Sequence, residues 1–169
     1  MSMTRGTNPE REAVKEYLQQ YHDAKVKKRI LEERHRTLSA ELRDPGVGST
    51  YRTMPTAKRQ AREGGAVSLV YWISEVEDRI DQQREAMAKA VLHVMDMIDI
   101  LPQNSMERTV VEMRHIDCKP WEKIAQAVHM SRSRVFDYYN AALDTLLACK
   151  RTGKLVGEYM AGKEKNKRG

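Results

Sequence analysis

Two arginines near the start of a predicted helix are the side chains of this chain best suited to bind a ligand. They are Arg132 and Arg134, and they follow Ser131, a residue type that often caps a helix N-terminus. A guanidinium group can pair bidentately with a guanine edge or with a phosphate, and the hydroxyl of Ser133 can contact several polar groups. The spacing therefore predicts a cationic, hydrogen-bonding surface on the first turn of a helix.

The elements that must position these side chains are two short helices joined by a turn, within residues 120–148. Pro120 suits the first position of the first helix, and His129-Met130 is expected to form the turn. Apolar side chains at helical spacing predict a shared core, in which a small residue lets the two helices cross closely. The expected members of this core are Trp121, Ile124, Ala125, Val128, Met130, Val135, Tyr138 and Ala142.

The other side chains of the second helix are expected on its outer surface. This layout is that of a helix-turn-helix, in which the second helix lies in the major groove of DNA and its N-terminal residues contact the bases. A plain helical hairpin with a solvated arginine face is the alternative interpretation. The predicted DNA-binding residues are Arg132, Ser133, Arg134, Phe136, Asp137, Tyr139 and Asn140, together with Lys119 before the first helix.

The positive charge of the chain is concentrated toward its C-terminus. The net charge is +6 at pH 7, from 30 Lys and Arg against 24 Asp and Glu. Residues 1–100 contain 17 basic and 16 acidic residues, whereas residues 101–169 contain 13 and 8. A basic C-terminal part is typical of a protein that binds phosphates, so the charge agrees with a nucleic-acid partner.

Two long helices are predicted before this region, at about residues 9–42 and 66–100. Asn8 is the expected cap of the first helix. Proline and glycine residues break the chain between the helices, so residues 43–65 are predicted as a loop. Apolar residues near heptad spacing predict a coiled-coil-like antiparallel hairpin or a contribution to a dimeric bundle. The alternative is a core stripe that packs on the third segment of the same chain.

The predicted fold is therefore all-α and has three parts. Residues 1–100 form the long hairpin, which oligomerises or binds a partner. Residues 101–149 form the helix-turn-helix bundle, which includes a further helix capped by Asn104 or Ser105. Residues 150–169 are predicted as a basic tail.

Parts of the C-terminal region resemble region four of bacterial primary sigma factors. The segments that carry the similarity are 108–114, 121–125 and 131–135, continued by Ala142, Leu143 and Leu146. Region four binds the upstream promoter element and docks on the flap of RNA polymerase, so the resemblance implies promoter DNA and polymerase as partners. It places residues 132–134, 136 and 137 against DNA. The sequence departs from the primary pattern at Ser133, Phe136 and Asp137, which implies a different promoter sequence.

The layout of the chain also resembles the RinA and ArpU group of phage late transcription regulators, over roughly residues 66–148. This resemblance implies a sequence-specific regulator encoded by a phage or prophage, which activates late genes from double-stranded promoter DNA. Its expected location is the cytoplasm of the bacterial host, in association with the nucleoid.

Two other functions stay open. A DNA-packaging oligomer similar to a small terminase subunit also joins a helix-turn-helix to a helical hairpin, although its helix-turn-helix is usually N-terminal. The second alternative is a protein that binds RNA polymerase or a sigma factor without contacting DNA.

Neither an enzyme nor a cofactor-binding protein is expected. The five histidines lack the spacing of a metal pair, and no glycine-rich phosphate loop follows a strand. Cys118 and Cys149 also lack ligand spacing, so they are expected to be reduced thiols of a cytoplasmic protein. No apolar run reaches the roughly 18 residues that span a bilayer, so no membrane partner is expected.

Overall fold

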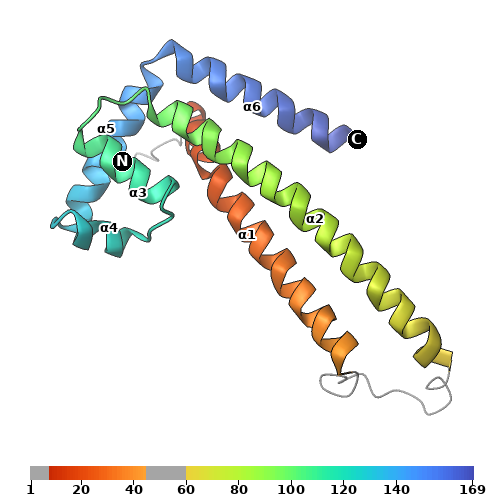
Figure 1. The fold of residues 1–169 in the computed structure, drawn as a ribbon. Coiled ribbons are helices and arrows are strands. Elements are labelled where there is room, and N and C mark those ends of the chain that lie inside the picture. The colour runs from red at the N-terminus through yellow and green to blue at the C-terminus, as the bar shows by residue number, and fades with distance from the viewer. Residues whose placement is uncertain (1–7, 45–59) are drawn as a thin grey trace, which may run out of the picture. The chain divides into compact units, whose positions relative to one another are not determined.

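The computed structural model describes residues 8–44 and 60–169, with side chains from residue 66 onward in the second range, and it is built from helices alone (Figure 1). Within these ranges there are six α-helices and no strand. They are α1 (Pro9–Arg43), α2 (Gln60–Ile98), α3 (Met106–His115), α4 (Trp121–Ala127), α5 (Arg132–Leu147) and α6 (Lys150–Arg168). The predicted all-α fold is confirmed.

The described residues divide into two compact units. The first unit contains residues 8–23 and 88–169, and the second contains residues 24–44 and 60–87. Both long helices therefore contribute to both units. The sequence predicts a boundary near residue 100, whereas the ends of α1 and α2 pack with α3–α6 in the first unit.

One hydrophobic core holds the first unit together. α1 contributes Val14 and Leu18, and α2 contributes Val94 and Met97, all at most 2% exposed. The remaining core side chains come mainly from the three short helices. Those from α3, α4 and α5 are Val110, Val111, Ile124, Val135, Tyr139, Ala142, Leu143 and Leu146. Burying these apolar side chains is the main favourable contribution to the stability of this unit.

Capping residues set where several helices begin. The Asn8 side chain accepts a hydrogen bond from the Glu10 amide at 3.0 Å, and Ser105 Oγ accepts from the Arg108 amide at 3.2 Å. These contacts satisfy amides that have no partner within the helix. The predicted caps at Asn8 and Ser105 are confirmed. After α2, Pro102 lies in the short connection that leads to α3.

The C-terminal segment differs from its prediction as a basic tail, because residues 150–168 form the 19-residue helix α6. Leu155, Val156 and Tyr159 lie on one face of α6 and pack against the core of the first unit. The Tyr159 ring contacts the Tyr17 ring edge-on, at 5.4 Å between centroids. Each interior glycine costs a helix about 1 kcal/mol relative to alanine, and this packing outweighs the cost of the glycines in α6.

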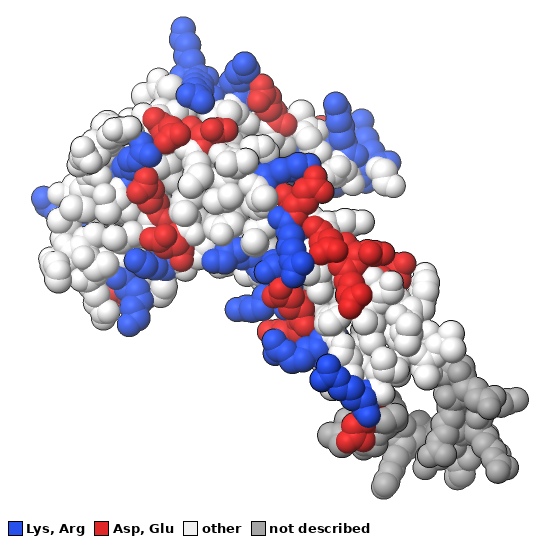
Figure 2. Space-filling view, viewed as in Figure 1, with Lys and Arg blue, Asp and Glu red and all other residues white. Residues whose placement is uncertain are grey.

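Basic side chains are exposed near both ends of α6. Seven of its residues are Lys or Arg and two are Glu, and Figure 2 shows the basic groups gathered toward both ends of the helix. Lys163 forms an ion pair with Glu16 of α1. The segment is therefore basic, as predicted, but folded.

The second unit consists of antiparallel stretches of α1 and α2. Gln83 Nε2 donates to the Ala24 carbonyl at 3.1 Å, and His35 Nε2 lies 2.8 Å from Glu77 Oε1. The later residue of α1, His35, pairs with the earlier residue of α2, Glu77, so the two helices are antiparallel. Four large apolar side chains near the start of this part of α2 are exposed. They are Val67, Val70, Tyr71 and Trp72.

The predicted loop at 43–65 agrees with the observed end of α1 to within one residue, but it extends too far at its C-terminal end. Arg43 belongs to α1, and residues 60–65 belong to α2, which includes the pair Gly64-Gly65. Residues 45–59 lie outside the described part of the chain. Glycine lowers helix stability but keeps its amide donor, so it does not end a helix as proline does.

None of the helices in the described ranges is both long and apolar enough to cross a membrane.

Candidate nucleic-acid interface

The turn between α4 and α5 is closed by backbone hydrogen bonds. The Met130 amide donates to the Ala125 carbonyl at 3.0 Å, and the His129 amide donates to the Gln126 carbonyl at 3.3 Å. This pair of bonds is the Schellman arrangement, which needs a left-handed residue after the helix. His129 supplies it with φ of 53°, although glycine is the usual residue there. The turn predicted at His129-Met130 is confirmed.

The first turn of α5 is exposed and capped as predicted. Ser131 Oγ accepts a hydrogen bond from the Arg134 amide at 3.2 Å. The side chains of Arg132, Ser133 and Arg134 are exposed, as are those of Asp137 and Asn140 further along the helix. Between residues 132 and 140, the exposed surface of α5 therefore carries two guanidinium groups, a hydroxyl, an amide and one carboxylate.

Loss of the cap should weaken the first unit. In Ser131→Ala, the Arg134 amide loses its acceptor, and we expect the free energy of unfolding to fall by about 1 kcal/mol. Ser133→Ala is the matched control, because Ser133 lies on the same exposed turn but is not the capping residue. Urea unfolding of both variants measures the difference, and equal stabilities would contradict the capping role.

The structure corrects the assignment of the two neighbouring tyrosines. Tyr139, predicted to face DNA, is 7% exposed and lies in the core. Its hydroxyl is 3.0 Å from Nε2 of His115, and its ring meets Trp121 edge-on at 5.0 Å. Tyr138, predicted in the core, is half-buried at its margin beneath the Arg134 guanidinium. Both tyrosines fit helical spacing from Val135, so the sequence pattern alone cannot choose between three and four residues.

Phe136, predicted to face DNA, is half-buried against Trp121. The two ring centroids are 4.6 Å apart. The Arg132 guanidinium lies over the Phe136 ring at 5.5 Å, and the Arg114 guanidinium lies over Trp121 at 4.7 Å. Aromatic faces attract cations, so this cluster orients two arginines at the edge of the core. Phe136 therefore packs against Trp121 and orients Arg132, which differs from its predicted position facing DNA.

Of the other predicted core residues, Ile124, Val135 and Ala142 are fully buried. The remaining ones are half-buried and pack against the core. They are Trp121, Ala125, Val128 and Met130. The sequence-based core is thus correct except for the tyrosine exchange, and it omits the fully buried Leu143.

Two of the predicted DNA-binding residues are held by contacts within the protein. Arg132 Nη1 lies 3.1 Å from Glu122 Oε1 of α4, in an exposed ion pair. The Lys119 carbonyl accepts from Arg114 at 3.1 Å, and its ammonium lies 3.7 Å from Asp117 Oδ2. These contacts hold Lys119 in the loop that precedes α4.

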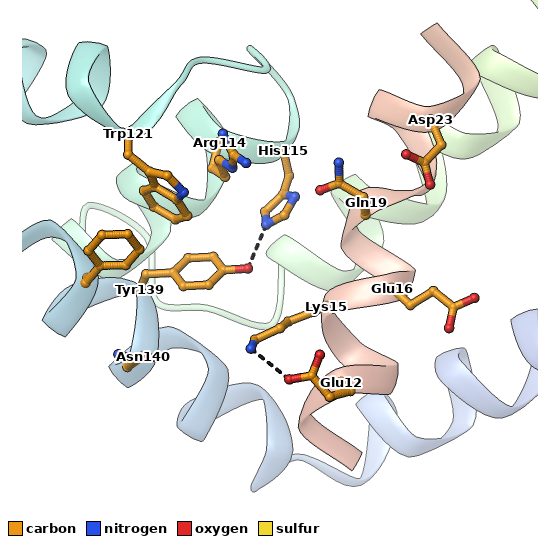
Figure 3. Close-up of a pocket in the computed structure, with 11 residues that line it drawn as sticks. Glu12, Lys15, Glu16, Gln19, Asp23, Arg114, His115, Trp121, Tyr139 and Asn140 are labelled. Carbon is orange, nitrogen blue, oxygen red and sulfur yellow. Dashed lines mark hydrogen bonds and ion pairs between the residues drawn. The ribbon is translucent and has the colours of Figure 1, made fainter. Parts of the chain in front are cut away.

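An open pocket of about 540 Å³ lies beside α5, lined by α1, α3, α4 and α5 (Figure 3). Three carboxylates of α1 line the pocket, and two of them form ion pairs with lysines. Glu12 Oε1 is 2.9 Å from Lys15 Nζ, and Glu16 pairs with Lys163. Arg11, one residue before Glu12, reaches α5 and lies 3.0 Å from Asp144 Oδ1. Lys15 and Lys163 therefore neutralise part of the negative charge of α1, and Arg11 neutralises Asp144 of α5.

His115 is a buried histidine that sequence reasoning missed. It is 3% exposed, and burial lowers its pKa from 6.5 to about 3. The positive charge of Arg114 and the neighbouring His22 act in the same direction, whereas the backbone of Leu18 opposes them. Burial also raises the pKa of the Tyr139 hydroxyl to about 12. Both members of the pair are therefore uncharged at neutral pH.

Within the described ranges, no three His, Cys, Asp or Glu side chains are arranged to hold a metal ion. Cys118 and Cys149 are half-buried and are not joined in a disulfide.

No protein-family model matches the chain, and neither a curated protein nor a solved structure shows significant similarity to it.

Proposed function

We propose that this protein is a sequence-specific DNA-binding transcription regulator and that α4 and α5 form its helix-turn-helix. In this role, α5 lies in the major groove and its first turns contact the bases. Arg132, Ser133, Arg134, Asp137 and Asn140 are the proposed contact residues. The resemblance of segments 108–114, 121–125 and 131–135 to sigma region four supports promoter DNA as the target and RNA polymerase as a further partner.

The observation that carries the proposal is the placement of the first turn of α5. Its two arginines are exposed, while Val135 and Tyr139 anchor the helix in the core. The Ser131 cap and the rigid turn fix the direction in which the helix begins. Groups that read a nucleic acid must be held in such a defined orientation, because hydrogen bonds to base edges depend on geometry.

The proposal is tested by replacing the arginines. Arg132→Ala and Arg134→Ala should each weaken binding to the preferred sequence by about 1–3 kcal/mol, where the residue contacts a base. Sequences are first selected from a library of random duplexes, and affinities are then measured by titration at several salt concentrations. A residue that contacts only phosphate would weaken all sequences alike and reduce the salt dependence.

Arg84→Ala is the matched control, because Arg84 is an exposed arginine of the second unit that pairs with Asp81 within α2. It removes the same charge far along the chain from α5. If both α5 variants bind all sequences as the wild type does, the assignment of α5 as the recognition helix is wrong.

We also propose that the long helices mediate association between copies. Support comes from Val67, Val70 and Tyr71, because these exposed apolar side chains share one face of α2 at helical spacing, and such surfaces often mark an interface. Measuring the mass in solution also separates the functions. A dimer agrees with a regulator, and a large closed ring would favour a DNA-packaging component.

A further inference from the structure

Arg11, in the first turn of α1, bridges two residues on the outer surface of α5. Its Nη2 donates to Asn140 Oδ1 at 2.9 Å and to the Asn140 carbonyl at 3.3 Å. Its Nη1 donates to Asp144 Oδ1 at 3.0 Å. Asn140 and Asp144 lie one helical turn apart, so a single guanidinium spans both. These contacts join segments of the first unit that are 129 and 133 residues apart in the sequence.

The contact determines which way the Asn140 amide points. A guanidinium has five donors and no acceptor, so the amide atom that faces it must be the oxygen. The same Nη2 also contacts the Asn140 backbone carbonyl, which places Arg11 on the backbone side of the amide. The Nδ2 donor and the second lone pair of Oδ1 are then left for a ligand. Nδ2 can donate a hydrogen bond to N7 of adenine, while Oδ1 accepts one from the N6 amino group.

We propose that Arg11 is a positioning residue of the DNA interface, which holds Asn140 so that it reads adenine. This inference rests on the proposed function. Without Arg11, the amide can rotate and lose the alignment of both hydrogen bonds, so discrimination at that base pair falls. Arg11 also places a positive charge next to Asp144, a carboxylate that would otherwise repel the phosphates. The DNA-binding unit therefore includes the start of α1 as well as residues 101–149.

Arg11 is proposed to act in two ways, by orienting Asn140 and by neutralising Asp144. Selection from random duplexes measures base preference and so distinguishes these two effects. Asn140→Ala identifies the base pair that Asn140 reads, since the adenine preference should disappear there alone. Arg11→Met should reduce the same preference by about fivefold to a hundredfold, the range of a lost bidentate contact. It should also weaken binding to all sequences, because Asp144 is left without its cation.

A lysine at position 11 separates positioning from charge. Arg11→Lys keeps the positive charge beside Asp144 but cannot span all three acceptors, so general affinity should recover while the adenine preference stays reduced. Lys15→Met is the matched control, because Lys15 is on the same helix and pairs with Glu12 rather than with α5. It should leave the base preference unchanged.

A double-mutant cycle tests whether Arg11 acts through Asn140. In the Asn140→Ala background, Arg11→Met should change base preference no further, since coupled residues are not additive. The inference is overturned if Arg11→Met selects the same sequences as the wild type, or if the two effects on preference add. The proposed function is tested independently of this inference, by the effects of Arg132→Ala and Arg134→Ala on DNA binding.

Discussion

Leu143→Ala is expected to lower the free energy of unfolding of the first unit by about 2–5 kcal/mol. Leu143 lies in the middle of α5 with 0% of its surface exposed, in the same core as Val110 and Ile124. Its truncation removes apolar contacts on one side of α3 and α4 and leaves a cavity that the rigid helices fill only in part. Denaturant unfolding followed by circular dichroism measures the loss.

Leu92→Ala is the control for this prediction, because Leu92 is also in the first unit but is 60% exposed. We expect a change within about 0.5 kcal/mol there, as for other surface substitutions. If the two leucine variants are equally stable, α5 does not pack as described. At low temperature, folded Leu143→Ala should keep its base preference, because the side chain points into the core and away from the proposed DNA-binding surface.

Short-range signals in the sequence are sufficient to predict where α1, α3 and α5 begin. Asn8, Ser105 and Ser131 each cap the helix that follows them, through a contact two or three residues away. The α4–α5 turn was predicted for a similar reason, since both of its backbone bonds close within five residues. Such features depend on neighbours in the sequence and are therefore visible without the fold.

Long-range packing explains what the sequence did not reveal. The apolar side chains at 155, 156, 159 and 160 predict only one short amphipathic turn, whereas α6 is 19 residues long and packs Val156 and Tyr159 against the core. Tyr139 rather than Tyr138 is in the core, where its hydroxyl meets His115, a residue 24 positions away in the sequence. The contact of Arg11 with Asn140 joins residues 129 positions apart, and no local pattern indicates it.

Acidification should destabilise the first unit through His115. The pKa of this histidine is lowered from 6.5 to about 3 in the folded protein, mainly by burial. Between these two values the unfolded chain binds one proton that the folded chain excludes, so stability falls as the pH falls. We expect a loss of about 2 kcal/mol between pH 7 and pH 5 from this residue, at about 1.4 kcal/mol for each pH unit below 6.5.

His115→Gln isolates this contribution, because glutamine does not titrate and can still bond to the Tyr139 hydroxyl. The substitution can itself change the free energy of unfolding at pH 7. The comparison is therefore between the losses in this free energy from pH 7 to pH 5 in the two proteins. We expect the wild type to lose about 2 kcal/mol more than the variant, measured by urea unfolding at both pH values. Equal losses would mean that His115 is solvated in the native protein. The burial of His115 beside the Leu18 backbone of α1 would then be contradicted as well.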